Sequence, residues 1–246
     1  MIVTEFGIKN EEVIILLHGG GLSWWNYTDE IELLKNQFHI ILPALDGHSG
    51  SDADHTSIED NAARIIKYID EKFDGQVLMI CGLSLGGQIL LEILSQRKDI
   101  CKFAIIESAL ALPMPVTHSL IELSIKLSYG LIQQKWFSKL QMRSLKIRSD
   151  LFDDYYRDTR AISSENYIRF MESNSAYRVK PSLSLCRTKS VIVVGSKERP
   201  IMKKSAKMIQ NLIPNSELII VKDYHHGDLS MNHADEYVKY MTTLMK

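Results

Sequence analysis

The 246-residue chain has little of what marks several specialised classes of protein. It has only three cysteines, Cys81, Cys101 and Cys186, and they lie far apart, which argues against a disulfide framework and favours a reducing, cytoplasmic location. Its formal net charge is −1, from 29 Lys and Arg against 30 Asp and Glu. Because it lacks the basic surplus of a nucleic-acid-binding domain, we expect no nucleic-acid partner.

Long apolar runs are also missing. Residues Met1–Glu5 show no basic segment followed by an apolar stretch, so we expect no secretory leader. The fully aliphatic run Val13–Leu17 is far too short to cross a bilayer. We therefore expect no membrane partner.

Short aliphatic runs alternate with segments of helical spacing along most of the chain. Because these runs are continuously apolar, they are typical of strands buried on both faces of a parallel sheet. The expected strands are Val13–Leu17, Phe38–Leu42, Val77–Cys81, Phe103–Ile106, Val191–Val194 and Leu218–Val221. The expected helices between them are Asp29–Gln37, Ser57–Lys72, Gln88–Gln96 and Met202–Leu212. The alternation predicts an α/β fold with a mainly parallel sheet, helices on both faces, and ligands at the carboxyl ends of the strands.

One long segment interrupts this alternation. From Ser108 to about Leu185 the pattern is helical and shows no strand signal. The helices expected there are Ser119–Leu131, Lys135–Ile147, Leu151–Arg160 and Ser164–Ser173. We interpret residues 108–185 as a helical cap inserted into a core formed by residues 1–107 and 186–246.

A serine lies at a sharp turn between an expected strand and an expected helix. Residues 82–87 read Gly-Leu-Ser-Leu-Gly-Gly and directly follow the run Val77–Cys81. Small residues two positions before and two after Ser84 let the backbone turn tightly, which holds the hydroxyl clear of the sheet. The N-terminus of the next helix offers N–H groups to an oxyanion. Ser84 is therefore the expected nucleophile.

A serine hydroxyl needs a base to take its proton and a carboxylate to orient that base. Glu198 lies in the loop after Val191–Val194, and His226 lies after Leu218–Val221 and directly before Gly227. The chain order Ser84, Glu198, His226 is the order of one known scaffold. The sequence therefore predicts a Ser-His-Glu triad.

Both partners of Ser84 have an alternative. His225 could serve as the base, but we prefer His226 because Gly227 allows a turn that aims the ring inward. Glu107 ends the strand Phe103–Ile106 at the same sheet edge and could replace Glu198 as the acid. His225 and His226 are adjacent, and adjacent histidines rarely reach one ion together, so we expect no metal. We also expect no cofactor.

The first apolar strand runs into His18-Gly19-Gly20-Gly21. Glycines let the backbone approach a substrate closely, so the N–H of Gly20 is expected to form an oxyanion hole with the N–H of Leu85, and Gly21 is the second choice. His18 is expected to brace this loop by hydrogen bonding. Residues considered for the substrate pocket are Gly21, Trp24, Trp136 and Phe137, with Tyr129, Phe152, Tyr155, Tyr156 and Met171 as further cap residues. Ordinary helix packing explains many of these aromatic residues equally well.

Together these motifs resemble the α/β-hydrolase superfamily, and the resemblance covers almost the whole chain. It is carried by the His18-Gly19-Gly20 loop, the Pro43–Ser51 loop with Ser49 at a usual glycine position, the turn Gly82–Gly86, the acid turn Gly195–Glu198 with Glu in place of the commoner Asp, and His226-Gly227. The resemblance implies an α/β-hydrolase fold with a helical cap and an eight-stranded sheet whose second strand is antiparallel. The chain looks most like small bacterial members grouped with esterases and with the lyase of the menaquinone pathway.

Three functions follow from these residues. The first is a serine hydrolase of small carboxylic esters or related acyl compounds that works through an acyl-enzyme. The second is a non-hydrolytic lyase of the menaquinone-pathway type using the same triad, and the third is a ligand-binding sensor with slow turnover. The expected partner is a small acyl substrate, and the protein is expected to be a monomer or a homodimer.

Overall fold

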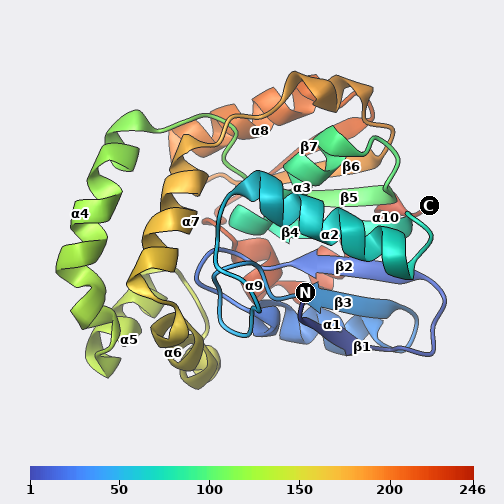
Figure 1. The fold of residues 1–246 in the computed structure, drawn as a ribbon. Helices are drawn as coiled ribbons and strands as arrows, with labels where there is room; N and C mark the ends of the chain where they lie inside the picture. The colour runs from blue at the N-terminus through green and yellow to red at the C-terminus, as the bar shows by residue number, and fades with distance from the viewer.

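A computed structural model describes all 246 residues and shows a seven-stranded sheet with helices on both faces (Figure 1). The strands are β1 (Val3–Phe6), β2 (Val13–Leu17), β3 (His39–Pro43), β4 (Val77–Leu83), β5 (Cys101–Glu107), β6 (Lys189–Gly195) and β7 (Ser216–Val221). They are ordered β1-β3-β2-β4-β5-β6-β7, and every neighbouring pair is parallel except β1 with β3. The expected α/β fold class is confirmed.

The sheet differs from the expectation in two respects. It has seven strands where the resemblance implied eight, and the antiparallel strand is β1, the first along the chain. β1 is a short edge strand whose side chains are all only partly buried, so it lacks the continuous apolar run by which the other strands were identified. Because edge strands are only partly buried, their number cannot be read from the pattern of apolar residues.

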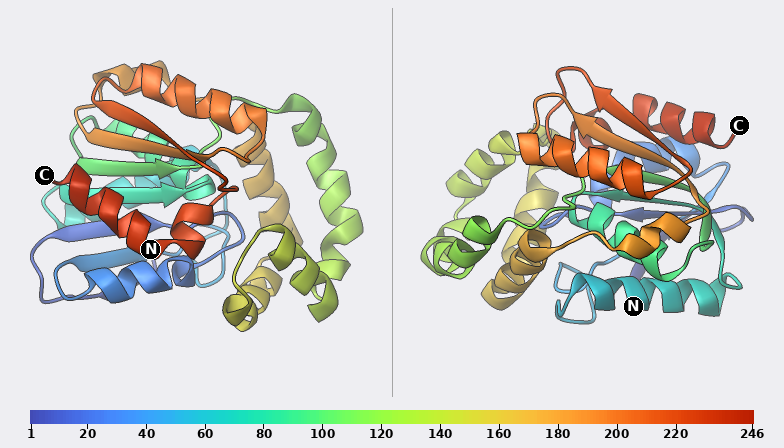
Figure 2. Two further views of the ribbon diagram at one scale, coloured as in Figure 1. Left: turned by 180° about the vertical axis from the view of Figure 1, so that it is seen from behind. Right: turned by 90° about the horizontal axis from the view of Figure 1, so that it is seen from above.

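Helices cover the two faces of the sheet as separate layers, seen edge-on in the right-hand view of Figure 2. The helices that pack on the sheet are α1 (Thr28–Leu34), α2 (Ile58–Lys72), α3 (Leu85–Gln96), α8 (Pro200–Leu212) and α10 (Ala234–Leu244). Alternate side chains of β2 enter the two cores: Val13, Ile15 and Leu17 lie in the core under α2, α3 and α8, and Ile14 and Leu16 lie in the core under α1 and α10. A strand buried on both faces explains why the whole run is aliphatic.

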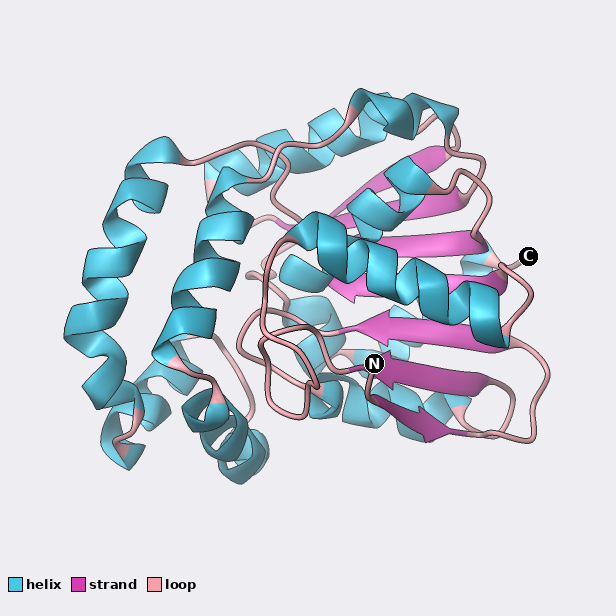
Figure 3. Cartoon of the chain, viewed as in Figure 1, coloured by secondary structure: helices cyan, strands magenta, loops and turns pink.

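The segment between β5 and β6 contains no strand. It holds α4 (Pro115–Ile132), α5 (Lys135–Ser144), α6 (Phe152–Ala161) and α7 (Ser164–Ala176), with short 3-10 turns at Ser149–Leu151 and Pro181–Leu185. We call α4–α7 and the loops between them the helical insertion. In Figure 3 the arrowheads of the parallel strands point toward this insertion, so it stands over the carboxyl ends of the strands. Ligand sites of open parallel sheets lie at that end.

None of the helices combines the length and apolarity needed to cross a membrane. The three cysteines are unpaired and buried. No group of three or more His, Cys, Asp or Glu side chains is arranged to hold a metal ion.

Candidate active site

Ser84 occupies a strained turn between β4 and α3. Its backbone has φ 53° and ψ −109°, a conformation that non-glycine residues rarely adopt. Two glycines make this turn possible: a Cβ on Gly82 would lie 2.4 Å from the carbonyl oxygen of Gly86, and a Cβ on Gly86 would lie 2.2 Å from that of Leu17. The backbone N–H of Ser84 donates to the carbonyl of Glu107 at 2.9 Å, which joins the turn to the end of β5.

The structure brings Ser84, His226 and Glu198 into one hydrogen-bonded relay. The Nε2 atom of His226 lies 2.9 Å from Ser84 Oγ, and its Nδ1 atom lies 2.8 Å from Glu198 Oε2. An ionised Glu198 accepts from Nδ1–H, which leaves Nε2 free to accept the proton of the serine hydroxyl. The arrangement is therefore oriented to make Ser84 a nucleophile.

Glu198 is held in a fully buried position. Its Oε1 atom accepts hydrogen bonds from the Gly195 N–H at 2.8 Å and from Ser108 Oγ at 2.7 Å. Burial raises the pKa of the Glu198 carboxyl, but the hydrogen bond and charge of His226, with hydrogen bonds from Gly195 and Ser108, bring it below its ordinary value overall. The carboxylate therefore stays ionised beside the imidazole.

Neither alternative residue takes part in this relay. The backbone N–H of His225 donates to Asp228, and its exposed side chain makes no hydrogen bond with Ser84. The Oε1 atom of Glu107 instead accepts from the backbone N–H groups of Leu229 and Ser230, at 3.2 and 3.3 Å, in the short helix α9 (Asp228–Asn232). Burial raises the pKa of Glu107 to about 7, and the nearby charge of Glu198 adds to this effect.

The loop after β2 lies beside the turn at Ser84. Gly20, Gly21 and Leu85 line one cavity together with Ser84, and a Cβ on Gly20 would lie 3.6 Å from the side chain of Leu85. His18 braces this loop: its Nδ1 donates to the carbonyl of Gly19 at 2.9 Å, and its Nε2 accepts from the N–H of Leu45. Burial lowers the pKa of His18 to about 4, so the ring stays neutral, as these two bonds require.

Two cavities meet at Ser84. The histidine-side cavity, of about 380 Å³, also contains His226, three cationic side chains and the apolar residues Leu110, Met114 and Met202. The oxyanion-side cavity, of about 230 Å³, contains Gly20 and Leu85 and is walled by Tyr155, Tyr167, Phe170 and Met171 of the insertion. Leu145 and Asn174 line both cavities.

Six of the residues considered for the pocket line neither cavity: Trp24, Tyr129, Trp136, Phe137, Phe152 and Tyr156. Trp24 lines a separate cavity and packs 5.8 Å from the ring of Phe6. Trp136 is 62 % exposed, and Phe137 is partly buried against the apolar cluster that includes Ile125 and Ile132 of α4. Trp136 lies five residues before Gln141, which lines the cavity together with Leu145 at the end of α5, so Trp136 is on another face of the helix.

Sequence reasoning missed several residues of the site. Ser108 donates a hydrogen bond to Glu198, but its position after a strand was the sole signal for it in the sequence. Tyr167, Phe170 and Asn174 lie on one face of α7, where helical spacing is equally compatible with a buried core. Their role as cavity walls depends on how the insertion folds over Ser84.

A mainly parallel sheet with a serine at a strand–helix turn, next to a histidine and a carboxylate on later strand ends, is the arrangement of an α/β-type hydrolase. Residues 14–240 match the family model described as the alpha/beta hydrolase family. The chain belongs to this family and is an enzyme of the hydrolase type.

Known relatives agree with this placement. The chain is 25 % identical over 252 residues to a 2-hydroxy-6-oxononadienedioate/2-hydroxy-6-oxononatrienedioate hydrolase of Escherichia coli O81 (strain ED1a), covering 93 % of this chain and 85 % of the relative. A thermophilic esterase from Thermogutta terrifontis superposes with a TM-score of 0.79 at 13 % identity, covering 100 % of this chain and 94 % of the esterase. MenH from S. aureus superposes with a TM-score of 0.77 at 18 % identity, covering 99 % and 97 %. At these identities the two structural matches establish the shared fold.

Proposed function

We propose that this protein is a serine hydrolase of small carboxylic esters or related acyl compounds, with Ser84 as nucleophile, His226 as general base and acid, and Glu198 as the orienting carboxylate. The observation that carries the proposal is the unbroken relay from Ser84 Oγ through both nitrogens of His226 to Glu198, with distances of 2.9 and 2.8 Å. Both distances are within the reach that proton transfer needs.

In the first half-reaction Ser84 Oγ attacks the carbonyl carbon of the substrate while His226 Nε2 takes the hydroxyl proton. The carbonyl oxygen becomes an oxyanion, which the N–H groups of Leu85 and Gly20 stabilise. When this intermediate collapses, the bond from carbon to the leaving-group oxygen breaks, and His226 returns its proton to that oxygen. The alcohol departs, and the acyl group stays on Ser84.

In the second half-reaction a water molecule attacks the acyl carbon and gives one proton to His226. The bond from carbon to Ser84 Oγ then breaks, and the proton returns to the serine. The carboxylic acid leaves and the enzyme is restored. Glu198 remains ionised throughout and stabilises the imidazolium that forms twice in each turnover.

The test combines covalent labelling with substitution. A fluorophosphonate probe should label the wild-type protein once, at Ser84, and Ser84→Ala should be unlabelled. Removing the hydroxyl should lower kcat on short-chain 4-nitrophenyl esters by at least about ten-thousandfold. Full activity in Ser84→Ala would overturn the proposal, and a loss in His225→Ala without one in His226→Ala would overturn the choice of base.

A second candidate is hydrolysis of a 6-oxo dicarboxylate, the kind of substrate named for the E. coli relative. Such a molecule carries a carboxylate at each end of its chain, on both sides of the oxo carbon. When the oxo carbon is at Ser84, one of the two carboxylates lies in the oxyanion-side cavity. No cation is available to that carboxylate, because none of the residues lining this cavity is charged. We therefore place ester hydrolysis first, and turnover of the dioate faster than of every ester tested would reverse that order.

A further inference from the structure

The two cavities at Ser84 differ in charge. Every residue that lines the oxyanion-side cavity is uncharged, and three of them are aromatic: Tyr155, Tyr167 and Phe170. The histidine-side cavity contains Lys146, Lys197 and Arg199, all with exposed side chains. The site is therefore neutral on one side of the nucleophile and cationic on the other.

The position of His226 determines which part of a substrate enters each cavity. His226 must give its proton to the leaving group, so the leaving group lies on the side of the imidazole. His226 lines the histidine-side cavity and not the oxyanion-side cavity, whereas Gly20 and Leu85 line the oxyanion-side cavity. A bound ester places its carbonyl oxygen at Gly20 and Leu85. Its acyl group then lies in the oxyanion-side cavity, and its leaving group lies in the histidine-side cavity.

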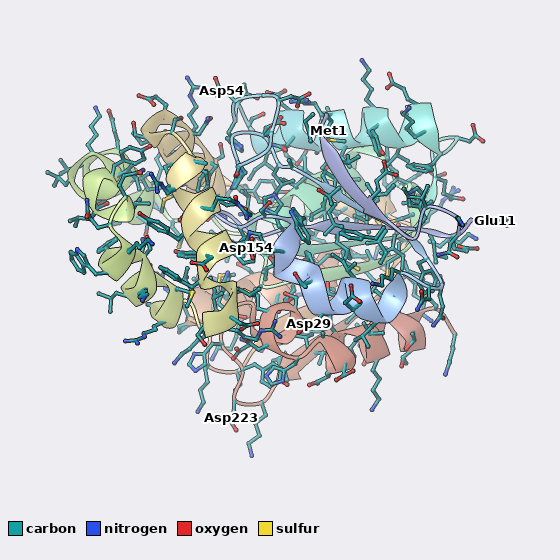
Figure 4. The ribbon with its side chains drawn as sticks, turned by 90° about the horizontal axis from the view of Figure 1, so that it is seen from below. Met1, Glu11, Asp29, Asp54, Asp154 and Asp223 are labelled. Atoms are coloured by element: carbon teal, nitrogen blue, oxygen red, sulfur yellow. The ribbon has the colours of Figure 1, made fainter.

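The protein neutralises only part of the positive charge of this cavity. Lys197 pairs with Asp223 at 3.2 Å, at the outer surface of the molecule (Figure 4). Lys146 and Arg199 form no ion pair. The one carboxylate in the lining, Glu198, is buried, and hydrogen bonds occupy both of its oxygens. Two cations therefore remain available to a ligand.

We propose that the natural substrate carries a negative charge on its leaving group, and that Lys146 and Arg199 bind this charge in the histidine-side cavity. The substrate class is an ester or thioester of a compact, neutral, apolar acid with an anionic alcohol or thiol. The anion is a carboxylate or a phosphate, since both accept hydrogen bonds from lysine and arginine. This inference rests on the proposed function, because it uses the direction in which His226 delivers its proton.

The first experiment compares two esters of the same acid. Butanoyl esters of 4-nitrophenol and of 3-carboxy-4-nitrophenol differ by one carboxylate on the leaving group. After correction for their rates of alkaline hydrolysis, kcat/KM should favour the carboxylated ester. The ratio should fall by about two- to fivefold in Lys146→Gln and in Arg199→Gln, and by about their product in the double variant. It should also fall as sodium chloride is raised, because exposed charges are screened.

A second arm distinguishes the source of the anion. Butanoyl-pantetheine and its 4′-phosphate carry the same thioester and differ by the phosphate alone. A larger preference for the phosphorylated thioester than for the carboxylated ester identifies a phosphate ligand, and the reverse identifies a carboxylate.

The matched control is Lys204→Gln, which removes an exposed cation of α8 that does not line the cavity. Its ratios should equal those of the wild type. Equal ratios in the double variant and the wild type would overturn the inference. So would a wild-type protein that prefers neither anionic substrate.

A binding measurement separates this inference from the proposed function. The Ser84→Ala protein should bind 5-hydroxy-2-nitrobenzoate, the carboxylated leaving group, more tightly than 4-nitrophenol, and Lys146→Gln with Arg199→Gln should remove the difference. If no ester is hydrolysed, the proposed function fails while this result still decides the charge preference. If esters are hydrolysed and the binding difference is missing, the charge inference alone fails.

Discussion

At the scale of single residues, Glu107, which ends β5, and Ser108, which follows it, contact the three loops that carry Ser84, Glu198 and His226. The carbonyl of Glu107 accepts the N–H of Ser84, and its carboxylate accepts two N–H groups of α9, the helix directly after His226-Gly227. The hydroxyl of Ser108 donates to Glu198 and accepts from the N–H of Gly227 at 3.4 Å. Both residues are buried, so these bonds are shielded from competing water.

Ser108 should act as a positioning residue for Glu198. Without its hydroxyl the carboxylate loses one of its hydrogen bonds, so we expect Ser108→Ala to lower kcat by about tenfold, with a smaller effect on KM. The pKa of Glu198 should rise, so the loss of kcat/KM should be larger near pH 4 than near pH 7. Steady-state kinetics from pH 4 to 9 measures both effects.

Two variants control for backbone and packing effects. Ser108 has φ 51°, so Ser108→Gly removes the hydroxyl and also relieves the strain. If strain were the cause, glycine would restore what alanine loses, whereas both variants should lose activity if the hydroxyl is the cause. Ser205→Ala removes a buried hydroxyl that has no partner, and it should keep full activity.

Glu107 should make stability depend on pH. Its pKa is about 7 in the folded protein, above the ordinary value of 4.5. Between these two pH values the folded protein keeps a proton that the unfolded chain has released, so the stability from Glu107 falls as pH rises, by up to about 1.4 kcal/mol per pH unit. Glu107→Gln has no such proton. The free energy of unfolding of the variant, minus that of the wild type, should therefore rise from pH 4.5 to 7 and then level off.

Urea denaturation at several pH values measures this difference. Taking the difference cancels other groups that titrate in the same window, such as Asp46, whose pKa burial raises to about 6. Glu217→Gln, at an exposed position of β7, should give a curve parallel to that of the wild type. Parallel curves for Glu107→Gln as well would show that Glu107 ionises normally.

At the scale of elements, the turn from β4 into α3 depends on how closely two backbones approach. A Cβ on Gly86 would collide with the carbonyl oxygens of Leu17 and His18, which cannot swing aside as a side chain can. We expect Gly86→Ala to lower the free energy of unfolding by about 3 kcal/mol and to reduce kcat, because α3 moves away from β2 and takes the Leu85 N–H with it.

Gly130→Ala is the matched control, because a Cβ there meets open space on α4. Alanine is the better helix former, so this variant should gain up to about 1 kcal/mol. Thermal unfolding and ester kinetics on the pair give the test. An active, stable Gly86→Ala protein would show that the sheet and helix have room to separate.

At the scale of the whole molecule, apolar packing and polar contacts both tie the insertion to the core. Asp158 of α6 is 3 % exposed and accepts hydrogen bonds from Trp25 Nε1 at 2.8 Å, in the 3-10 turn Trp24–Tyr27, and from Ser49 Oγ at 3.0 Å, in the loop after β3. Arg148, between α5 and α6, pairs with Asp29 of α1. In Figure 4, Asp29 and Asp154 lie where the insertion meets α1.

Asp158→Ala should loosen this attachment. It leaves Trp25 Nε1 without its acceptor and removes the carboxylate that Arg157 binds, so we expect a loss of about 3 kcal/mol. KM should rise, because Tyr155 and Tyr167 of the insertion form the cavity wall. Hydrogen exchange should quicken in α4–α7 more than in the sheet.

Asp154→Ala serves as the comparison, because Asp154 binds the same Arg157 at the surface. Exposed ion pairs contribute little, so this variant should stay within about 1 kcal/mol of the wild type. Equal exchange rates in the two variants would mean that Asp158 does not hold the insertion in place.

The amino-acid sequence by itself determined the alternation of strands and helices and the order of Ser84, Glu198 and His226. A continuously aliphatic strand such as β2 is recognisable because both of its faces are buried. The turn at Ser84 is recognisable because closely approaching backbones leave space for glycine alone at positions 82 and 86. Such signals are local, so they can be read along the chain.

Contacts between distant residues were decided by the tertiary structure. His225 and His226 are equivalent by spacing, and only the turn before α9 directs one ring to Ser84. The half-exposed β1 strand, the bond from Ser108 to Glu198 and the cavity wall formed by α7 leave no local pattern either. Each depends on which surfaces meet after folding, and periodicity records only whether a side chain is buried.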